Sequence, residues 1–209
     1  WVGQRIRTTA TIYFYDYQDK QVSDREGNET RIWNAAEAES YGFEFEGTGY
    51  LANSLLLAVT YSYLDTEYTH FITNDQADLA AGNQQLAGNP LTNSPKHKVT
   101  VSGTYTVPTD AGDFSLNAVY YWQDAAYFRP FATWRSHAGA WDRTDARLMW
   151  NSTNFKWRAS LYVKNIFDEV GVFDSVVGGP YENFWRTAGD WYAAATPPRQ
   201  FGIELSYKW

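Results

Sequence analysis

The chain closes on the nine residues that decide its fold, Phe201-Gly202-Ile203-Glu204-Leu205-Ser206-Tyr207-Lys208-Trp209. Every odd position is large and apolar or aromatic, and every even position is small or polar. Because successive side chains of a β-strand point to opposite faces, this alternation predicts a strand with one apolar and one polar face. About nine to eleven residues are what a tilted strand needs to cross a bilayer. One such segment also suits a soluble β-sandwich, so the rest of the chain must distinguish the two folds.

The same alternation recurs along the chain and predicts eight strands, at about residues 4–17, 41–51, 55–64, 98–107, 114–123, 144–150, 155–164 and 201–209. Long and short connections alternate between them without exception. Loops above about fifteen residues are uncommon in compact soluble domains, whereas outer-membrane barrels place short turns in the periplasm and long loops outside. The sequence therefore predicts an all-β, antiparallel, up-and-down transmembrane β-barrel with both chain ends on the periplasmic side.

Aromatic side chains gather near the ends of the predicted strands. At the short-turn end they are Trp150, Phe155, Trp157 and Trp209, and at the other end Tyr61, Tyr63, Tyr120 and Trp122. Such girdles mark the two membrane interfaces, where a ring is half buried and its polar edge stays in water. A soluble sandwich gives no reason for this segregation.

Composition excludes several classes of site. The chain has 209 residues, no cysteine and a net charge of −7. Neither disulfides nor thiolate metal sites are available, and an acidic protein is a poor partner for nucleic acid. The histidines, His70, His97 and His137, fall in or near loops, and no pair has metal-ligand spacing. We therefore expect no metal site, no cofactor and no nucleic-acid partner.

The polar faces of the predicted strands carry charges of both signs. We expect the following residues to face the barrel lumen: Arg5, Arg7, Glu44, Glu46, Arg147 and Arg158. Glu44 and Glu46 share a face about 7 Å apart, and paired carboxylates can perform acid–base chemistry, as in a hydrolase. The interpretation we prefer is that Arg5 and Arg7 on the neighbouring strand balance the two glutamates, since unpaired buried charge is costly.

Two long loops are crowded with aromatic and basic residues. The loop before the predicted sixth strand holds Arg129, Trp134, Arg135, His137, Trp141 and Arg143, and the last loop holds Tyr181, Phe184, Trp185, Arg186, Trp191 and Tyr192. Exposed aromatic clusters often mark ligand contact. Trp and Tyr can stack on sugar or catecholate rings, and Arg can hold an anionic chelate bidentately. Loops that pack on one another at the barrel mouth explain the same residues, so both interpretations stay open.

Three motifs resemble the TonB-dependent outer-membrane receptors. Residues 41–47 are similar to that family's Gly-x-Glu-x-Glu strand. Residues 88–98 are similar to its Gly-Asn-x-Leu-x-x-x-Pro-x-His-Lys segment, and residues 163–168 to its Val-x-Asn-Leu-Phe-Asp motif. The terminal aromatic Trp209 resembles the strand signal read by the barrel-assembly machinery, although Phe is more usual there.

The resemblance implies a barrel of about 22 strands with an N-terminal plug, of which residues 1–209 look like the last eight strands without the plug domain. It implies a non-enzymatic receptor in the outer membrane of a Gram-negative bacterium that imports a scarce nutrient such as a ferric siderophore. Its partners would be membrane lipid, the TonB complex through the missing N-terminal part, the barrel-assembly machinery and a small-molecule ligand. The alternative is a self-contained eight-stranded barrel with a structural or adhesion role.

Overall fold

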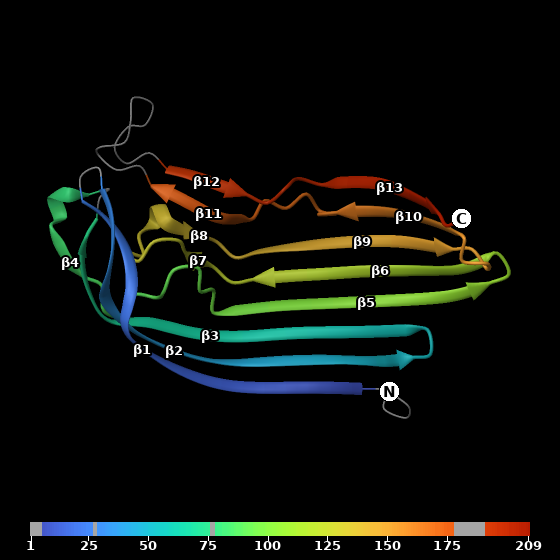
Figure 1. Ribbon diagram of the computed structural model, residues 1–209, viewed down its shortest axis with the longest axis horizontal. Coiled ribbons are helices and arrows are strands. Elements are labelled where there is room, and N and C mark those ends of the chain that lie inside the picture. The colour runs from blue at the N-terminus through green and yellow to red at the C-terminus, as the bar shows by residue number, and fades with distance from the viewer. Residues whose placement is uncertain (1–5, 27–28, 76–77, 178–190) are drawn as a thin grey trace.

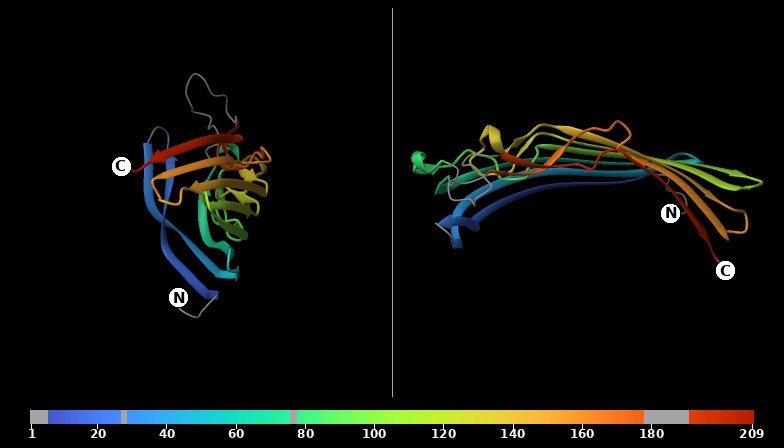
Figure 2. Two further views of the ribbon diagram at one scale, coloured as in Figure 1. Left: turned by 90° about the vertical axis from the view of Figure 1, so that its right-hand side faces the viewer. Right: turned by 90° about the horizontal axis from the view of Figure 1, so that it is seen from above.

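A computed structural model describes residues 6–26, 29–75, 78–177 and 191–209. Eight long strands form one antiparallel sheet in chain order: β1 (Ile6–Glu26), β2 (Glu29–Ala52), β3 (Leu55–Asn74), β5 (His97–Thr109), β6 (Gly112–Gln123), β9 (Trp141–Asn151), β10 (Trp157–Lys164) and β13 (Gln200–Tyr207). The predicted all-β, antiparallel, up-and-down arrangement is confirmed. The sheet bends into an arc (Figure 2), and β1 and β13 are its two edges, so these eight strands do not close a barrel. This disfavours the self-contained eight-stranded alternative.

The small elements all lie at one end of the sheet, opposite the short turns and the two chain ends (Figure 1). They are η1 (Leu79–Ala81), β4 (Asn83–Gln85), β7 (Ala126–Tyr127), η2 (Trp134–Ser136), β8 (His137–Ala138), β11 (Val172–Val177) and β12 (Trp191–Ala195). The predicted separation of short turns from long connections is confirmed for the connections after β3, β6 and β10. Most of the residues predicted to connect the first two strands instead belong to β1 and β2. Within the described part of the chain, no helix is long and apolar enough to cross a membrane.

The strand register sorts the side chains onto two faces. On the apolar face Leu148 lies between Leu116 and Leu161, and Leu161 lies beside Ile203. Leu161 is 51% exposed and Ile203 is 76% exposed. A soluble sandwich would bury these side chains against a second sheet, so that alternative is excluded. The polar face carries the intervening residues, such as Arg147.

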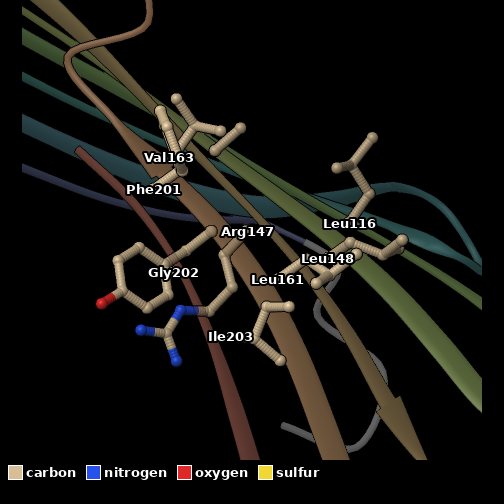
Figure 3. A pocket seen from close by; sticks show the side chains of 10 residues that line it. Leu116, Arg147, Leu148, Leu161, Val163, Phe201, Gly202 and Ile203 are labelled. Atoms are coloured by element: carbon tan, nitrogen blue, oxygen red, sulfur yellow. The ribbon is translucent and has the colours of Figure 1, made fainter. Parts of the chain in front are cut away.

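A shallow hollow of about 420 Å³ marks the apolar face. Its lining includes Ala146 and the side chains of Leu116, Leu148 and Leu161, which Figure 3 labels. Arg147 extends away from these leucines toward the polar face. Apolar surface left in water costs about 25 cal/mol per Å², so this face is suited to hydrocarbon.

Three strands run farther than the sequence predicts. β1 ends at Glu26 instead of residue 17, β2 begins at Glu29 instead of residue 41, and β3 ends at Asn74 instead of residue 64. Both faces of these extensions carry polar residues, so no alternation marks them. The backbone ladder persists because it satisfies the peptide groups whatever the side chains are. A bulge near Asp19, whose φ is +51°, shifts the register there.

Two further strand ends differ from the prediction. Phe155 has a φ of +54° and belongs to the turn before β10, which begins at Trp157. The last strand ends at Tyr207, although the Lys208 amide still donates a hydrogen bond to the Lys156 carbonyl at 2.8 Å.

A small core lies at the loop end of β2 and β3. It consists of Ala36, Ala38, Tyr68, Phe71 and Leu86, with Val22, Leu91 and Phe131 packed against it. The two alanines lie on the polar face, where the connection after β3 covers them. This connection therefore forms a fixed wall at the mouth of the sheet.

A new charge is expected to destabilise the protein much more on the apolar face than on the polar face. Val59→Arg places an arginine on the apolar face between Gly47 and Val101, and we expect a loss of about 2–4 kcal/mol in lipid. Thr60→Arg, one residue on, points to the polar face beside Glu46 and should cost less than about 1 kcal/mol. Urea unfolding of the full-length protein from phospholipid vesicles measures both. Equal losses would contradict the assignment of the faces.

Candidate functional site

Three tyrosines form a ladder on the polar face of β1. Tyr13, Tyr15 and Tyr17 occupy every second position, so their side chains leave the strand on one side. The Tyr13 and Tyr15 ring centroids are 5.4 Å apart, and those of Tyr15 and Tyr17 are 5.9 Å apart with planes at 26°. We call these three residues the tyrosine ladder. It lines one side of a groove of about 510 Å³.

The opposite wall of the groove is the segment from Leu91 to Ser94. Thr66 of β3 holds both of its ends, because its hydroxyl accepts a hydrogen bond from the Leu91 amide at 3.1 Å and donates one to the Ser94 hydroxyl at 3.0 Å. The Asn93 amide donates to the Tyr127 carbonyl of β7 at 2.8 Å. This wall is therefore tied to two parts of the fold.

The groove has a cation toward one end and a carboxylate toward the other. The Lys20 ammonium lies 5.4 Å from the Tyr17 ring centroid. Glu44 lies across from Thr11, below the ladder. The groove thus presents exposed ring surface, hydroxyl groups, a lysine at one end and a glutamate at the other. Side chains of these kinds can bind a small molecule.

A second charged cluster lies around Asp65 of β3, just beyond the predicted span of that strand. The Asp65 carboxylate accepts hydrogen bonds from Lys96 at 3.1 Å, Tyr41 at 3.0 Å and Tyr63 at 3.1 Å. Burial raises the pKa of Asp65, but these hydrogen bonds outweigh it and leave the pKa below its ordinary value. Asp65 therefore stays ionised at neutral pH and anchors the segment that follows the Leu91–Ser94 wall.

Arg129, a predicted ligand residue, is engaged within the protein. Its guanidinium contacts the Asp75 carboxylate at 2.6 and 3.3 Å and lies 5.1 Å from the Phe131 ring centroid. The two charged side chains are only 19% and 8% exposed. Arg129 thus joins the connection after β6 to the end of β3, which favours loop packing over ligand contact at this position.

Trp141 and Arg143 are also in internal contacts. The Trp141 ring packs on Tyr121 with centroids 5.1 Å apart, and its buried indole N–H has no hydrogen-bond partner among the described residues. Arg143 pairs with Asp145 through two hydrogen bonds of 2.8 and 2.6 Å. Both residues lie on the polar face of β9, so they belong to a strand of the sheet and not to the loop before it.

Three predicted ligand residues remain accessible. Trp134 is 78% exposed, and the Arg135 guanidinium lies 5.3 Å from its ring centroid. His137 is exposed in β8 with its ring 5.1 Å from that of Tyr127. Trp185 and Arg186 lie outside the described residues. Trp191 begins β12, and its side chain lies outside the description too.

The predicted lumen-facing residues lie on the polar face where they are described. Arg147 pairs with Glu204 at 2.8 Å, and Ser160 donates to the same carboxylate at 3.1 Å, so the contact crosses β9, β10 and β13. Arg158 donates to the Asn151 amide oxygen at 2.9 Å.

The expected balance of Glu44 and Glu46 by Arg5 and Arg7 stays a prediction. Arg7 lies across from Thr48, one step along the face from Glu46, and Thr9 lies directly across from Glu46. Arg5 lies outside the described residues. Across the sheet both glutamates face hydroxyl-bearing residues, since Glu44 lies across from Thr11 and Ser62, and Glu46 lies across from Thr9 and Thr60.

The motif residues of 163–168 serve the structure. Asn165 is fully buried, and its amide group donates to the Glu169 and Pro197 carbonyls at 2.9 and 3.1 Å while accepting from the Glu169 amide at 3.0 Å. Its own backbone amide donates to Asp145 at 2.8 Å. Asn165 also has a φ of +54°, a conformation that Asn tolerates better than most residues.

Sequence reasoning did not single out the tyrosine ladder. Its signal was present, since tyrosine recurs at positions i, i+2 and i+4 of the polar face, where small or charged residues are usual. What the sequence lacked was the opposite wall, because residues 91–94 reach the ladder only through the folded connection. No group of three potential ligand residues among the described side chains could hold a metal ion.

Comparison with known proteins gives one family. Residues 1–166 match the family described as TonB dependent receptor-like, beta-barrel. No curated protein sequence matches the chain.

Solved structures share the fold. The ferric yersiniabactin uptake receptor FyuA from Yersinia pestis superposes with a TM-score of 0.77 at 19% identity, over 97% of this chain and 27% of FyuA. The siderophore receptor PiuA from Acinetobacter baumannii gives 0.73 at 21%, over 98% and 26%. The copper transporter OprC gives 0.68 at 16%, over 98% and 30%. The chain thus spans about a quarter of the length of the first two, and these identities establish the fold alone.

Removal of the Arg129 side chain should loosen the mouth. In Arg129→Ala the Asp75 carboxylate loses a charged, largely buried partner, and we expect local opening to become easier by about 1–3 kcal/mol. Hydrogen exchange of the full-length protein should show faster exchange in β4. Arg135→Ala, which removes a half-buried arginine that lies over the Trp134 ring in the same connection, is the control. Unchanged exchange in both variants would contradict the role of Arg129.

Asn165→Ala should destabilise the connection after β10 by about 3 kcal/mol, since three hydrogen bonds are lost in a buried setting. Asn165→Gly separates causes, because glycine accepts the positive φ but makes none of the side-chain bonds. Proteolytic nicking between residues 167 and 199 measures the effect. Wild-type resistance of Asn165→Gly would show that backbone conformation, not hydrogen bonding, is what Asn165 supplies.

Proposed function

Because this chain belongs to the TonB-dependent receptor-like β-barrel family, we propose that it forms part of an outer-membrane receptor that imports a scarce nutrient such as a ferric siderophore. The resemblance seen in the motifs is confirmed at the level of the family. Its members are receptors and transporters of the outer membrane of Gram-negative bacteria, not a class of enzymes. The finer statements, on substrate, energy coupling and partners, are the proposal.

The observation that carries the proposal is the two-faced single sheet with its long connections at one end. The apolar face leaves residues such as Ile203 exposed and ready for lipid, while the polar face holds ion pairs such as Arg147–Glu204. Such a wall separates hydrocarbon from a polar interior. In this proposal the connections after β1, β3, β6 and β10 face the outside and meet the ligand first.

Ligand contact is assigned in the proposal to the accessible residues at the mouth. Trp134, Arg135 and His137 can meet a ligand without breaking an internal contact of the kind that holds Arg129. Trp185, Arg186 and Trp191 stay predictions. The polar face would hold the plug, TonB would supply the energy, and the terminal strand with Trp209 would be read by the assembly machinery.

The proteins of similar fold limit the choice of substrate only to a class. They include a ferric yersiniabactin uptake receptor, a siderophore receptor and a copper transporter. Metal chelates are therefore the first compounds to test, and ferric chelates come first among these.

The test is uptake of radioactive iron, supplied as a panel of ferric chelates, by iron-starved cells that carry or lack the full-length gene. We expect one chelate to enter only with the gene present and only while the proton gradient is intact. In Trp134→Ala, binding of that chelate should weaken about three- to tenfold, because one exposed ring is lost from the mouth. Phe155→Ala, at the opposite end, is the control.

Two results would overturn parts of the proposal. If the cells take up none of the metal chelates, the proposed transport function is wrong. Unaltered affinity in Trp134→Ala, with uptake intact, would remove Trp134 from the site and leave transport standing.

A further inference from the structure

We propose that β10 and β13 carry a binding site for an anionic phospholipid, with a basic pocket for its phosphate and an apolar hollow for one of its acyl chains. The site goes beyond the import of a nutrient. It rests on the proposed function in one respect, namely that the short turns face the periplasm. This places the phosphate pocket at the inner leaflet of the outer membrane.

The basic pocket lies at the short-turn end of the sheet, where β10 and β13 run side by side (Figure 1). It has a volume of about 540 Å³, and its lining includes Lys156, Arg158 and Lys208 together with Tyr207 and Trp209. We call it the rim pocket. Lys208 follows the alternation of the polar face and Tyr207 that of the apolar face, so the pocket takes residues from both sides of the wall. It is therefore open to a group that reaches around the rim from the lipid.

The rim pocket has an excess of positive charge. Lys156, Arg158 and Lys208 are all exposed, and none of them forms an ion pair with another described residue. The Lys208 amide donates to the Lys156 carbonyl at 2.8 Å, so two lysines are neighbours across the strands. Like charges in such a position destabilise a sheet. An anion bound between them would offset this repulsion.

Arg158 is oriented for the same anion. Its Nε donates to the Asn151 amide oxygen at 2.9 Å, which leaves both Nη atoms without a partner among the described residues. Asp113 lies across from Asn151 on the other side, so Asn151 separates this carboxylate from Arg158. A guanidinium with two free N–H groups suits the bidentate binding of a phosphate.

Aromatic side chains place the rim pocket at the depth of lipid headgroups. On the apolar face the ring centroids of Trp157 and Tyr207 are 4.6 Å apart, and those of Tyr207 and Trp209 are 5.3 Å apart. Clusters of Trp and Tyr at strand ends lie at the membrane–water interface. The cations of the rim pocket follow directly on these rings, so a lipid phosphate is the anion nearest to hand at this level.

The apolar hollow described above belongs to the same two strands. Leu161 of β10 and Ile203 of β13 line it (Figure 3). Leu161 is four residues from Trp157, which is about 13 Å along the strand. Between the two cavities the apolar face presents the small Ala159 beside Leu205. An acyl chain can therefore lie along the strands from the rim pocket to the hollow.

The two cavities together select the ligand class. A free anion would occupy the rim pocket but leave the hollow unused. A zwitterionic lipid would bring a second, positive group to a pocket that has no carboxylate among its described lining residues. An anionic phospholipid matches both cavities, because it joins a net negative headgroup to hydrocarbon.

The experiment measures lipid binding to the full-length protein in detergent micelles. Radioactive dioleoylphosphatidylglycerol or dioleoylphosphatidylcholine is added at increasing concentration, and the lipid that elutes with the protein in gel filtration is counted. We expect the wild type to bind phosphatidylglycerol about tenfold more tightly. Lys156→Gln and Lys208→Gln should each weaken its binding about three- to tenfold, because one positive charge is lost. Ala146→Leu should weaken it about threefold, because the added side chain fills the hollow.

Each kind of variant has a matched control. Lys164→Gln removes a cation from the opposite end of β10, and Ala10→Leu enlarges an alanine on the apolar face of β1. Neither control should change the affinity for phosphatidylglycerol. Heat-modifiable electrophoretic mobility confirms that every variant is folded.

Three results would overturn the inference. They are equal affinity of the wild type for the two lipids, wild-type affinity in both lysine variants, and wild-type affinity in Ala146→Leu. If inorganic phosphate displaces the lipid at concentrations no higher than that of the lipid, the rim pocket serves free anions and the assignment to a lipid is wrong. The proposed import stands in all these cases, since only the uptake experiment with metal chelates tests it.

Discussion

The backbone hydrogen-bond ladder is the constraint on which the rest of this structure depends. In hydrocarbon no water can satisfy a peptide group, so a spanning chain must pair every strand with a neighbour. The sheet from β1 to β13 meets this demand across eight strands in chain order. Once the ladder is fixed, alternate residues must point to opposite sides, and the apolar and polar faces follow from the sequence.

The ladder also explains why the strands extend beyond the membrane span. Past residue 17 of β1 neither face needs to be apolar, yet pairing with β2 continues to the end of the hairpin. Beyond the predicted membrane span, side-chain hydrogen bonds and ion pairs stabilise the connections between strands. The Arg129–Asp75 pair, the Lys96–Asp65 pair and the buried Asn165 each join segments that are far apart in sequence. These contacts fix the described parts of the connections to the strands.

The aromatic and basic residues near the long connections differ in burial and in their internal contacts. The sequence predicts Arg129, Arg143 and Trp141 as ligand residues. In the structure Arg129 pairs with Asp75, Arg143 pairs with Asp145, and the Trp141 ring packs on Tyr121. Tyr15 and Tyr17 looked like ordinary strand residues and are left exposed beside a formed groove. Residue type alone does not separate these cases, because the partner that occupies a side chain comes from another loop.

The sequence by itself determined the strands, their alternation, the end at which the turns are short and the motifs of the family. These are local properties, since a period of two is written in consecutive residues and a turn in a few more. Tertiary structure alone decided which polar residues meet, how far β1–β3 extend, and that residues 91–94 face the tyrosine ladder. Several of these features depend on contacts between positions 25 to more than 50 residues apart, such as Leu91 with Thr66 and Arg129 with Asp75, and no local pattern encodes those contacts.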